Sequence, residues 1–457
     1  MFKGIESTTV SKKSILFLIK DLWGIDHAVF YSLLYKTWRV LSVPVTIWLV
    51  ITKFSPEVQG YYYTFNSLLI FQTFLELGFG VVMVQFVSHE WAHLKLNQQN
   101  DIVGEPKVIS HLASLIKMGI KWYLLLAGTF FAVVGTAGYF FLSQHETNVN
   151  FQIPWWLLCA AVSFSIVLLP MRYLLEGSNQ IAKNQIILLK ASIVSTLAGW
   201  LAIYYGAGLY SLVIICATSV IVGFLLLFPT FLPFYKVLKM KHNVYHISWR
   251  NDFWPQQWRI GVSWLSGFFM FQAFVPIMFY LHGPVIAGQM GVAIQIYNAV
   301  NSFAQSWTYA VAPKMGMLSA KKNFTALRVL IKRTYLRSLM ACIVFSIVAF
   351  LIISLLHIYN FAQAERLPSL ISISIFLMVL IAMQLSNVET QAIRFQKKEP
   401  FVKASITSAI LVILSNFYLG RTFGILGAAI GFALIMLLIT IPWCHRIYKN
   451  EINKLLW

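Results

Sequence analysis

The stretch Leu209–Tyr235 reads LYSLVIICATSVIVGFLLLFPTFLPFY and contains no charged residue. Lys236, Lys239 and Lys241 follow it directly. A bilayer core about 30 Å thick is crossed by roughly 20 apolar residues in a helix. The stretch therefore predicts a transmembrane helix that ends in a positively charged connection.

Eleven further segments have the same apolar character, which predicts an all-α membrane protein with 12 transmembrane helices. The predicted spans are Tyr31–Lys53, Tyr61–Ser88, Trp122–Leu142, Ile153–Met171, Leu188–Tyr205, Leu209–Tyr235, Ile260–Leu281, Val285–Val311, Leu339–Ile358, Pro368–Val388, Val402–Leu419 and Ile425–Cys444. No predicted outer connection is long enough to fold as a domain.

The basic residues fall almost entirely in alternate connections. Of the 35 Lys and Arg residues, 32 lie on one predicted side, and only Lys53, Arg366 and Arg421 lie on the other. Cytoplasmic loops are enriched in Lys and Arg, so both termini are expected in the cytoplasm of a bacterial inner-membrane protein. The net charge of +20 then reflects contact with anionic membrane lipids, and no nucleic-acid partner is expected.

The composition supports a membrane protein, because 59% of the residues are hydrophobic and only 11% are charged, against about 25% charged in soluble domains. Lys12, Lys13, Lys20 and neighbouring apolar residues predict an amphipathic segment on the inner surface. The four cysteines have no metal-ligand spacing and are expected to be packing residues: Cys159, Cys216, Cys342 and Cys444.

An internal repeat relates the two halves of the chain. Glu176 is followed by a KAS sequence that begins at Lys190. The same pattern occurs 213 residues later, with Glu389 and a KAS sequence that begins at Lys403. PEVQG at residues 56–60 likewise corresponds to PVIAG at residues 284–288. Repeats of this kind predict two pseudo-symmetric six-helix bundles that can rock against each other.

This repeat sets the expected domain organisation. Residues 1–30 form the surface segment, 31–235 the N-lobe, 236–258 a cytoplasmic linker, 259–446 the C-lobe, and 447–457 a cytoplasmic tail.

Two predicted spans carry polar residues at helical spacing, as expected for helices that line an aqueous path. The candidates for a path that accepts sugar hydroxyls are Tyr62, Asn66, Thr73, Gln295, Asn298, Ser302, Gln305 and Tyr309. Hydrogen bonding between helices is the alternative role for such side chains.

Charged residues within or beside the spans suggest how a charged substrate could be handled. Cations pair well with phosphate oxygens, and the candidates are Lys36, Arg39, Arg172 and Arg259. Glu76 is the deepest acid and lies at a predicted depth similar to that of Arg39. We therefore expect an Arg39–Glu76 ion pair, either structural or one that exchanges Arg39 for a coupling H⁺ or Na⁺.

Residues 89–93, HEWAH, match the H-E-x-x-H pattern of zinc proteases. A third zinc ligand is missing, however, and the motif lies at a predicted membrane edge. We expect neither a metal site nor a cofactor here.

The stretch Phe54–Leu94, FSPEVQGYYYTFNSLLIFQTFLELGFGVVMVQFVSHEWAHL, resembles the polysaccharide transport family, the oligosaccharide flippases of the multidrug/oligosaccharidyl-lipid/polysaccharide exporter (MOP) superfamily. The LEGSNQ run at residues 175–180 is also similar to the fourth helix of that superfamily. The resemblance implies a V-shaped exporter that moves a polyprenyl-diphosphate-linked oligosaccharide, such as an O-antigen or capsule repeat unit, to the outer leaflet. It also implies a non-enzyme that could work beside polysaccharide polymerase machinery.

Two other functions stay open from the sequence. One is a cation-coupled multidrug exporter of the same superfamily, although its cationic substrates would favour acidic linings and the first span has Lys36 and Arg39 but no acid. The other is a membrane enzyme, namely a glycan polymerase, a glycosyltransferase or a metalloprotease. The polymerase or glycosyltransferase would need an outer loop with carboxylates, whereas the outer loops offer only Glu57, Glu146 and Glu365.

Overall fold

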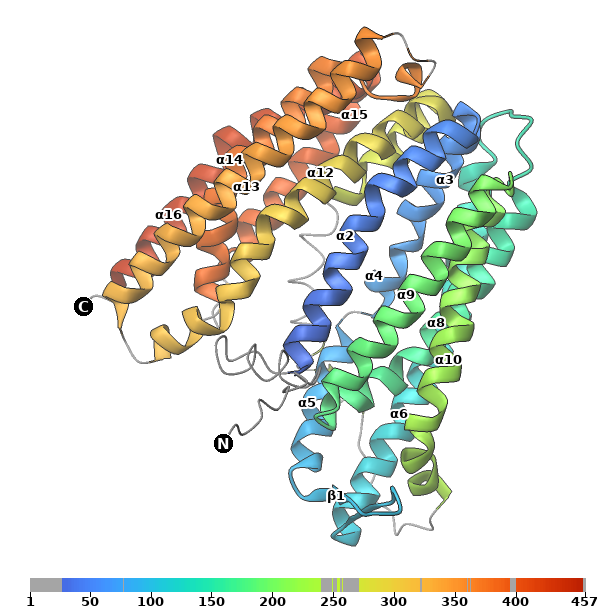
Figure 1. Ribbon diagram of the computed structural model, residues 1–457, viewed down its shortest axis with the longest axis vertical. Helices are drawn as coiled ribbons and strands as arrows, with labels where there is room; N and C mark the ends of the chain where they lie inside the picture. The colour runs from blue at the N-terminus through green and yellow to red at the C-terminus, as the bar shows by residue number, and fades with distance from the viewer. Residues whose placement is uncertain are drawn as a thin grey trace, which may run out of the picture.

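The fold is described from a computed structural model that covers residues 27–76, 78–239, 249, 253, 254, 257, 271–320, 323–359, 361, 363–394 and 400–454. Two groups of long helices converge at the upper right of Figure 1 and diverge toward the other side. We call α2–α10 the N-terminal helix group and α12–α16 the C-terminal helix group. The predicted surface segment and Arg259 lie outside the described residues.

The described elements are almost all helical. In chain order they are α2 (His27–Lys53), α3 (Pro56–Leu69), α4 (Phe71–Glu76), α5 (Phe79–Trp91), β1 (Leu94–Leu96), β2 (Ile102–Gly104), α6 (Pro106–Thr129), η1 (Phe130–Val134), α7 (Gly135–Leu142), α8 (Gln152–Gly177), α9 (Ile181–Tyr204), α10 (Tyr210–Lys239), α12 (Phe274–Ala320), α13 (Phe324–Ile358), η3 (Ala364–Arg366), α14 (Leu370–Arg394), α15 (Val402–Ile435), η4 (Met436–Thr440) and α16 (Ile441–Lys454).

Among the described residues, nine helices are long and apolar enough to cross a membrane, or ten if the bent pair 56–76 and 79–91 forms one span. The count therefore differs from the 12 predicted spans. Two of the nine, Phe274–Tyr309 and Val402–Glu451, each contain residues of two predicted spans. Val402–Glu451 has 50 residues and would extend about 75 Å if straight, well beyond a core of about 30 Å.

Both of these long helices fold back at a glycine. Gly424 has φ 56° and Gly283 has φ 81°, left-handed values that glycine adopts without a Cβ clash. Past Gly424, a Cβ on Gly427 would overlap the Leu419 carbonyl. Each stretch is therefore a helical hairpin that brings two predicted spans together.

The hairpin at Gly283 is shown by two rings. Phe271 and Tyr297 lie 5.6 Å apart between ring centroids. In a straight helix, 26 residues would separate them by about 39 Å. Part of predicted span seven, residues 260–270, lies outside the described residues.

Several helices begin earlier or end later than hydropathy predicts. α6 begins at Pro106 and α13 at Phe324, well before the predicted spans, and α16 runs to Lys454 through the predicted tail. Hydropathy identifies the part of a helix in hydrocarbon, whereas the helix itself can continue into the polar interface with charged side chains facing water.

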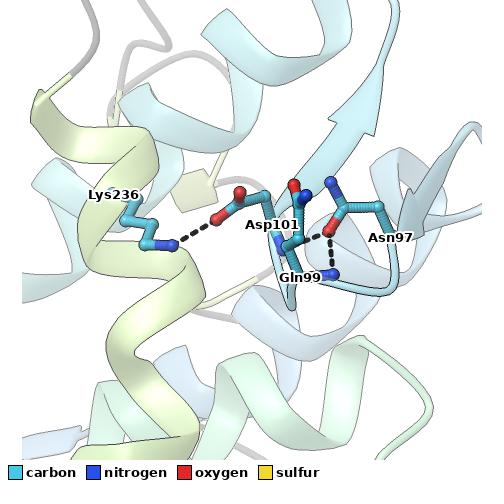
Figure 2. A network of polar contacts seen from close by, with 4 residues as sticks. All are labelled: Asn97, Gln99, Asp101 and Lys236. Carbon is cyan, nitrogen blue, oxygen red and sulfur yellow. Dashed lines mark hydrogen bonds and ion pairs between the residues drawn. The ribbon is translucent and has the colours of Figure 1, made fainter.

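A β-hairpin follows α5, with Leu94 paired to Gly104. Its turn is organised by Asn97, whose Oδ1 accepts hydrogen bonds from the backbone N–H groups of Gln99 (3.0 Å) and Asp101 (2.8 Å). Figure 2 shows this turn and the contact of Asp101 with Lys236 of α10, at 2.5 Å. The helices α5, α6 and α10 meet this hairpin at one end of the molecule. We call this end, where the helices join the basic connections, the basic end.

The two helix groups meet at the opposite, short-loop end. A Cβ on Gly60 of α3 would overlap the carbonyl of Pro284 in α12, and a Cβ on Gly288 would lie 3.1 Å from the Gly60 nitrogen. The Gln59 amide donates to the Arg366 carbonyl at 3.1 Å. Backbone thus approaches backbone at this end, which requires glycine on both sides.

Candidate functional site

Two of the predicted cations lie in the N-terminal half of α2. Lys36 and Arg39 are both exposed. The Lys36 ammonium lies 5.2 Å from the ring centroid of Tyr309 on α12, and the Arg39 guanidinium lies 5.9 Å from the ring of Tyr35. Cations over aromatic faces at these distances are attracted by the ring. Lys36 and Tyr309, assigned from the sequence to different roles, are therefore brought together across the two helix groups.

A third predicted cation, Arg172 of α8, lies deeper in the N-terminal group. Its guanidinium is close enough to Tyr35 and Glu176 to interact with both electrostatically. Its Nε is buried without a hydrogen-bond partner among the described residues. Tyr35 is therefore close to both the exposed Arg39 and the half-buried Arg172.

Glu76 lies where the second predicted span is broken. α4 ends at Glu76, Gly78 adopts φ 74°, and α5 begins at Phe79, with a bend of 45° between the two parts. The sequence predicts one span from Tyr61 to Ser88, and the structure divides this stretch into α3, α4 and α5. The glycine allows a left-handed turn that no hydropathy profile registers.

The Glu76 carboxylate binds two tyrosines. Its Oε1 accepts hydrogen bonds from the hydroxyls of Tyr123 (2.6 Å, α6) and Tyr173 (2.7 Å, α8). A Cβ on Gly80 would overlap the Tyr173 ring, so glycine permits this approach. The expected Arg39–Glu76 ion pair is not among the ion pairs of the described residues. A depth estimated from helical rise does not give the direction of a side chain, and the break contributes to the difference.

The predicted polar stripes differ in exposure. Asn298, Ser302 and Tyr309 on α12 are exposed, as is Thr73 on α4. Gln305 is half-buried and donates to Asn301. The four residues of α12 lie on a helix that packs against α2.

The remaining stripe residues are engaged within the helices. Tyr62 is only 4% exposed and its ring packs on Phe54 and Tyr63, so it lines no open path in this conformation. Asn66 is half-buried and donates to the Tyr62 carbonyl. Gln295 has a buried Oε1 without a partner among the described residues.

The HEWAH sequence ends α5 at the basic end. Glu90 lies 3.5 Å from His111 and 3.9 Å from His89, and the rings of His89 and His93 are 6.4 Å apart. Within the described part of the chain, no cluster of three His, Cys, Asp or Glu side chains could hold a metal ion.

The repeat-related acids have different partners. Glu176 Oε1 accepts a hydrogen bond from the Asn184 amide at 2.7 Å. Glu389, 3% exposed, lies 2.8 Å from His445 of α16. Tyr123, Tyr173 and His445 are the contacts that the sequence did not indicate, since only the fold brings them to an acid.

The structure was compared with known proteins. No protein-family model matches the sequence, and no curated protein sequence matches it. Solved structures match over nearly the whole chain. The lipid II flippase MurJ in an inward closed conformation superposes with a TM-score of 0.62 at 14% identity, covering 97% of this chain and 89% of MurJ.

Two multidrug transporters match similarly. An inward-facing multidrug resistance MATE family transporter of the MOP superfamily gives a TM-score of 0.60 at 13% identity, over 96% of this chain and 99% of that one. The MATE multidrug transporter DinF-BH gives 0.56 at 13% identity over both complete chains. This chain has the MOP transporter fold. It is a multi-pass membrane protein whose structural neighbours are transporters.

Proposed function

We propose that this chain is a flippase that moves a polyprenyl-diphosphate-linked oligosaccharide from the inner to the outer leaflet by alternating access. The charge distribution of the sequence places the basic end in the cytoplasm. The flippase MurJ in an inward closed conformation is among the structures that share the fold. The carried unit would be a repeat unit of a surface polysaccharide such as an O-antigen or capsule.

Alternating access requires two related lobes, and we assign residues 31–235 and 259–446 to them. The contact between Gly60 and Gly288 supports this assignment, because the sequence repeat makes these two positions equivalent. Equivalent positions touch each other only near a two-fold axis. The hairpins at Gly283 and Gly424 allow the predicted 12 spans.

The observation that carries the proposal is the set of cations and aromatic rings at Lys36, Arg39 and Arg172. α2 contains no acid, and it presents Lys36 beside Tyr309 and Arg39 beside Tyr35. Such a surface attracts a diphosphate and offers aromatic faces to sugars. The exposed Asn298, Ser302 and Thr73 would continue the glycan path, and Arg259 is proposed as a further cation.

We assign cation coupling to Glu76. A carboxylate held by two tyrosine hydroxyls at a helix break can accept H⁺ or coordinate Na⁺ with the oxygens already in place. The nearby rings and charges of Tyr173, Arg172 and Tyr35 connect this carboxylate with Arg39, in place of the direct ion pair expected from the sequence.

A cation-coupled multidrug exporter is the second candidate function, favoured by the structural match to MATE transporters. Organic cations would be repelled by Lys36 and Arg39, whereas a diphosphate would be attracted. The charge of the substrate therefore separates the two functions.

The test is deletion of the gene, followed by analysis of lipid-linked intermediates, surface polysaccharide and drug resistance. Accumulation of complete lipid-linked repeat units on the inner leaflet is expected. Complementation with Arg39→Gln or Lys36→Gln should lower surface polysaccharide at least tenfold, whereas Lys53→Gln, at the other end of α2, should restore it. Altered drug resistance with normal surface polysaccharide would show a drug exporter, and incomplete units would indicate a synthetic enzyme.

A further inference from the structure

A column of aromatic rings lies beside Glu76, and two of its rings come from the segment that joins the two helix groups. Phe253 stacks on Phe79 of α5 with centroids 5.1 Å apart, and on Phe86 at 4.5 Å. Trp249 stacks on Trp122 of α6 at 5.2 Å. Within the predicted linker, residues 236–258, the described residues Trp249 and Phe253 therefore stack on the N-terminal helix group.

Phe79 is the centre of this column. It is the first residue of α5, directly after Gly78 in its left-handed conformation, and it is fully buried. Its ring contacts Trp122 at 5.2 Å, Phe253 at 5.1 Å and Tyr123 at 5.6 Å, the last edge-on. Any shift of Phe253 therefore acts at the helix break.

The same ring contacts reach the carboxylate. Tyr123 packs its ring on Phe79 and donates its hydroxyl to Glu76 at 2.6 Å. Packed rings at near-van der Waals distance transmit displacement because protein interiors are close-packed. Phe253, Phe79, Tyr123 and Glu76 thus form one continuous line of contacts.

The linker residues hold one another in place. Trp249 donates its indole N–H to Gln257 Oε1 at 3.0 Å, and both Phe253 and Gln257 are fully buried. Residues 249, 253 and 257 are spaced four apart, the spacing of one helical face. The chain passes from α10 to the C-terminal helix group through this segment, so these residues belong to the covalent connection between the two groups.

We infer that Phe253 is a positioning residue for Glu76, through which the linker adjusts the cation site to the relative position of the two helix groups. The inference rests on the proposed coupling role of Glu76. Binding of H⁺ or Na⁺ at Glu76 and seating of Phe253 on Phe79 are expected to favour each other, since such coupling is reciprocal.

The experiment measures cation binding directly on the full-length protein purified in detergent. The shift of the unfolding midpoint is recorded on adding NaCl in place of choline chloride, and separately as pH is varied. Wild-type protein should respond to one of the two cations, and Glu76→Gln should abolish that response. If wild type and Glu76→Gln respond alike, the coupling role proposed for Glu76 is wrong.

Phe253→Leu then tests the inference itself, because leucine keeps the apolar volume but cannot stack. The cation concentration that gives half of the shift should rise three- to tenfold, and Phe253→Tyr should restore it. Phe376→Leu, in the buried ring cluster with Phe274 and Phe432, is the matched control and should leave it unchanged. If Phe253→Leu and Phe376→Leu respond alike while Glu76→Gln abolishes the shift, the inference about Phe253 is overturned.

Discussion

The two ends of this protein hold its helix groups in different ways. At the short-loop end, α3 and α12 touch through backbone at Gly60, Pro284 and Gly288. At the same end, the Arg366 guanidinium donates to the carbonyls of Ile51, at 2.6 Å, and of Phe54. Nearer the basic end, one contact between the groups is Lys36 over the Tyr309 ring, and both of these side chains are exposed.

Shape determines the contact between the helix groups at the short-loop end, whereas charge determines it at the basic end. Backbone packed on backbone tolerates almost no change in volume, so the short-loop end closes in one geometry. Long charged side chains can exchange one partner for another at small cost. A transporter that accepts a charged headgroup at the basic end benefits from this difference, since the substrate can replace the side-chain contacts there.

The largest effect is expected where the short-loop end is tightest. Gly60→Ala adds a methyl group that overlaps the Pro284 carbonyl, and overpacking of this kind costs about 1–3 kcal/mol. Thermal unfolding in detergent should show the loss, and a cysteine placed at Ser55 should react faster with a water-soluble maleimide. Gly128→Ala is the control, because nothing lies within 4 Å of that position. Equal stability of the two variants would show that the helix groups adjust easily.

An intermediate effect is expected for Arg366→Met. The substitution removes the charged donor from the Ile51 and Phe54 carbonyls at the end of α2, and hydrogen bonds to charged groups contribute about 1.5–3 kcal/mol. Because Arg366 is half-buried, we expect a loss near the lower value, measured by thermal unfolding. Arg421→Met, at an exposed site of the same end, should cost much less, and a cost as large as that of Arg366→Met would refute the capping role.

The smallest effect is expected at the basic end. Lys236→Met breaks the ion pair with Asp101 (Figure 2), in which the side chains are 55% and 32% exposed. Exposed pairs contribute about 0–1 kcal/mol, so the unfolding midpoint should change little. The change should be smaller still in high salt. If Lys236→Met lost as much stability as Arg366→Met, the proposed difference between the basic end and the short-loop end would be refuted.

Much of the fold could be predicted from the sequence, because hydropathy and charge report directly on the bilayer. The repeat also placed PEVQG opposite PVIAG, and the structure brings Gly60 and Gly288 of those sequences into contact. The span count differed because the hairpins at Gly283 and Gly424 join pairs of predicted spans into long helices. Hydropathy also gave no indication of the break at Gly78.

The candidate site was less predictable. The residue types on α2 were informative, because cations within a span are costly and tend to be functional. The partners of Glu76 were not, since Tyr123 and Tyr173 lie 47 and 97 residues away and tyrosine is common in membrane helices. The partners of Phe253 could not be predicted either, because only the fold shows which rings it stacks on.

The cap that Arg366 places on α2 spans more than 300 positions of the chain. The carbonyls of Ile51 and Phe54 lack this donor until residue 366 has been synthesised. The first membrane helix therefore leaves the ribosome early but gains its native end late, after α12 and α13 have been synthesised. Completion of this end of α2 consequently depends on synthesis of the chain through residue 366, and a protein truncated before that residue would leave the Ile51 and Phe54 carbonyls without this donor.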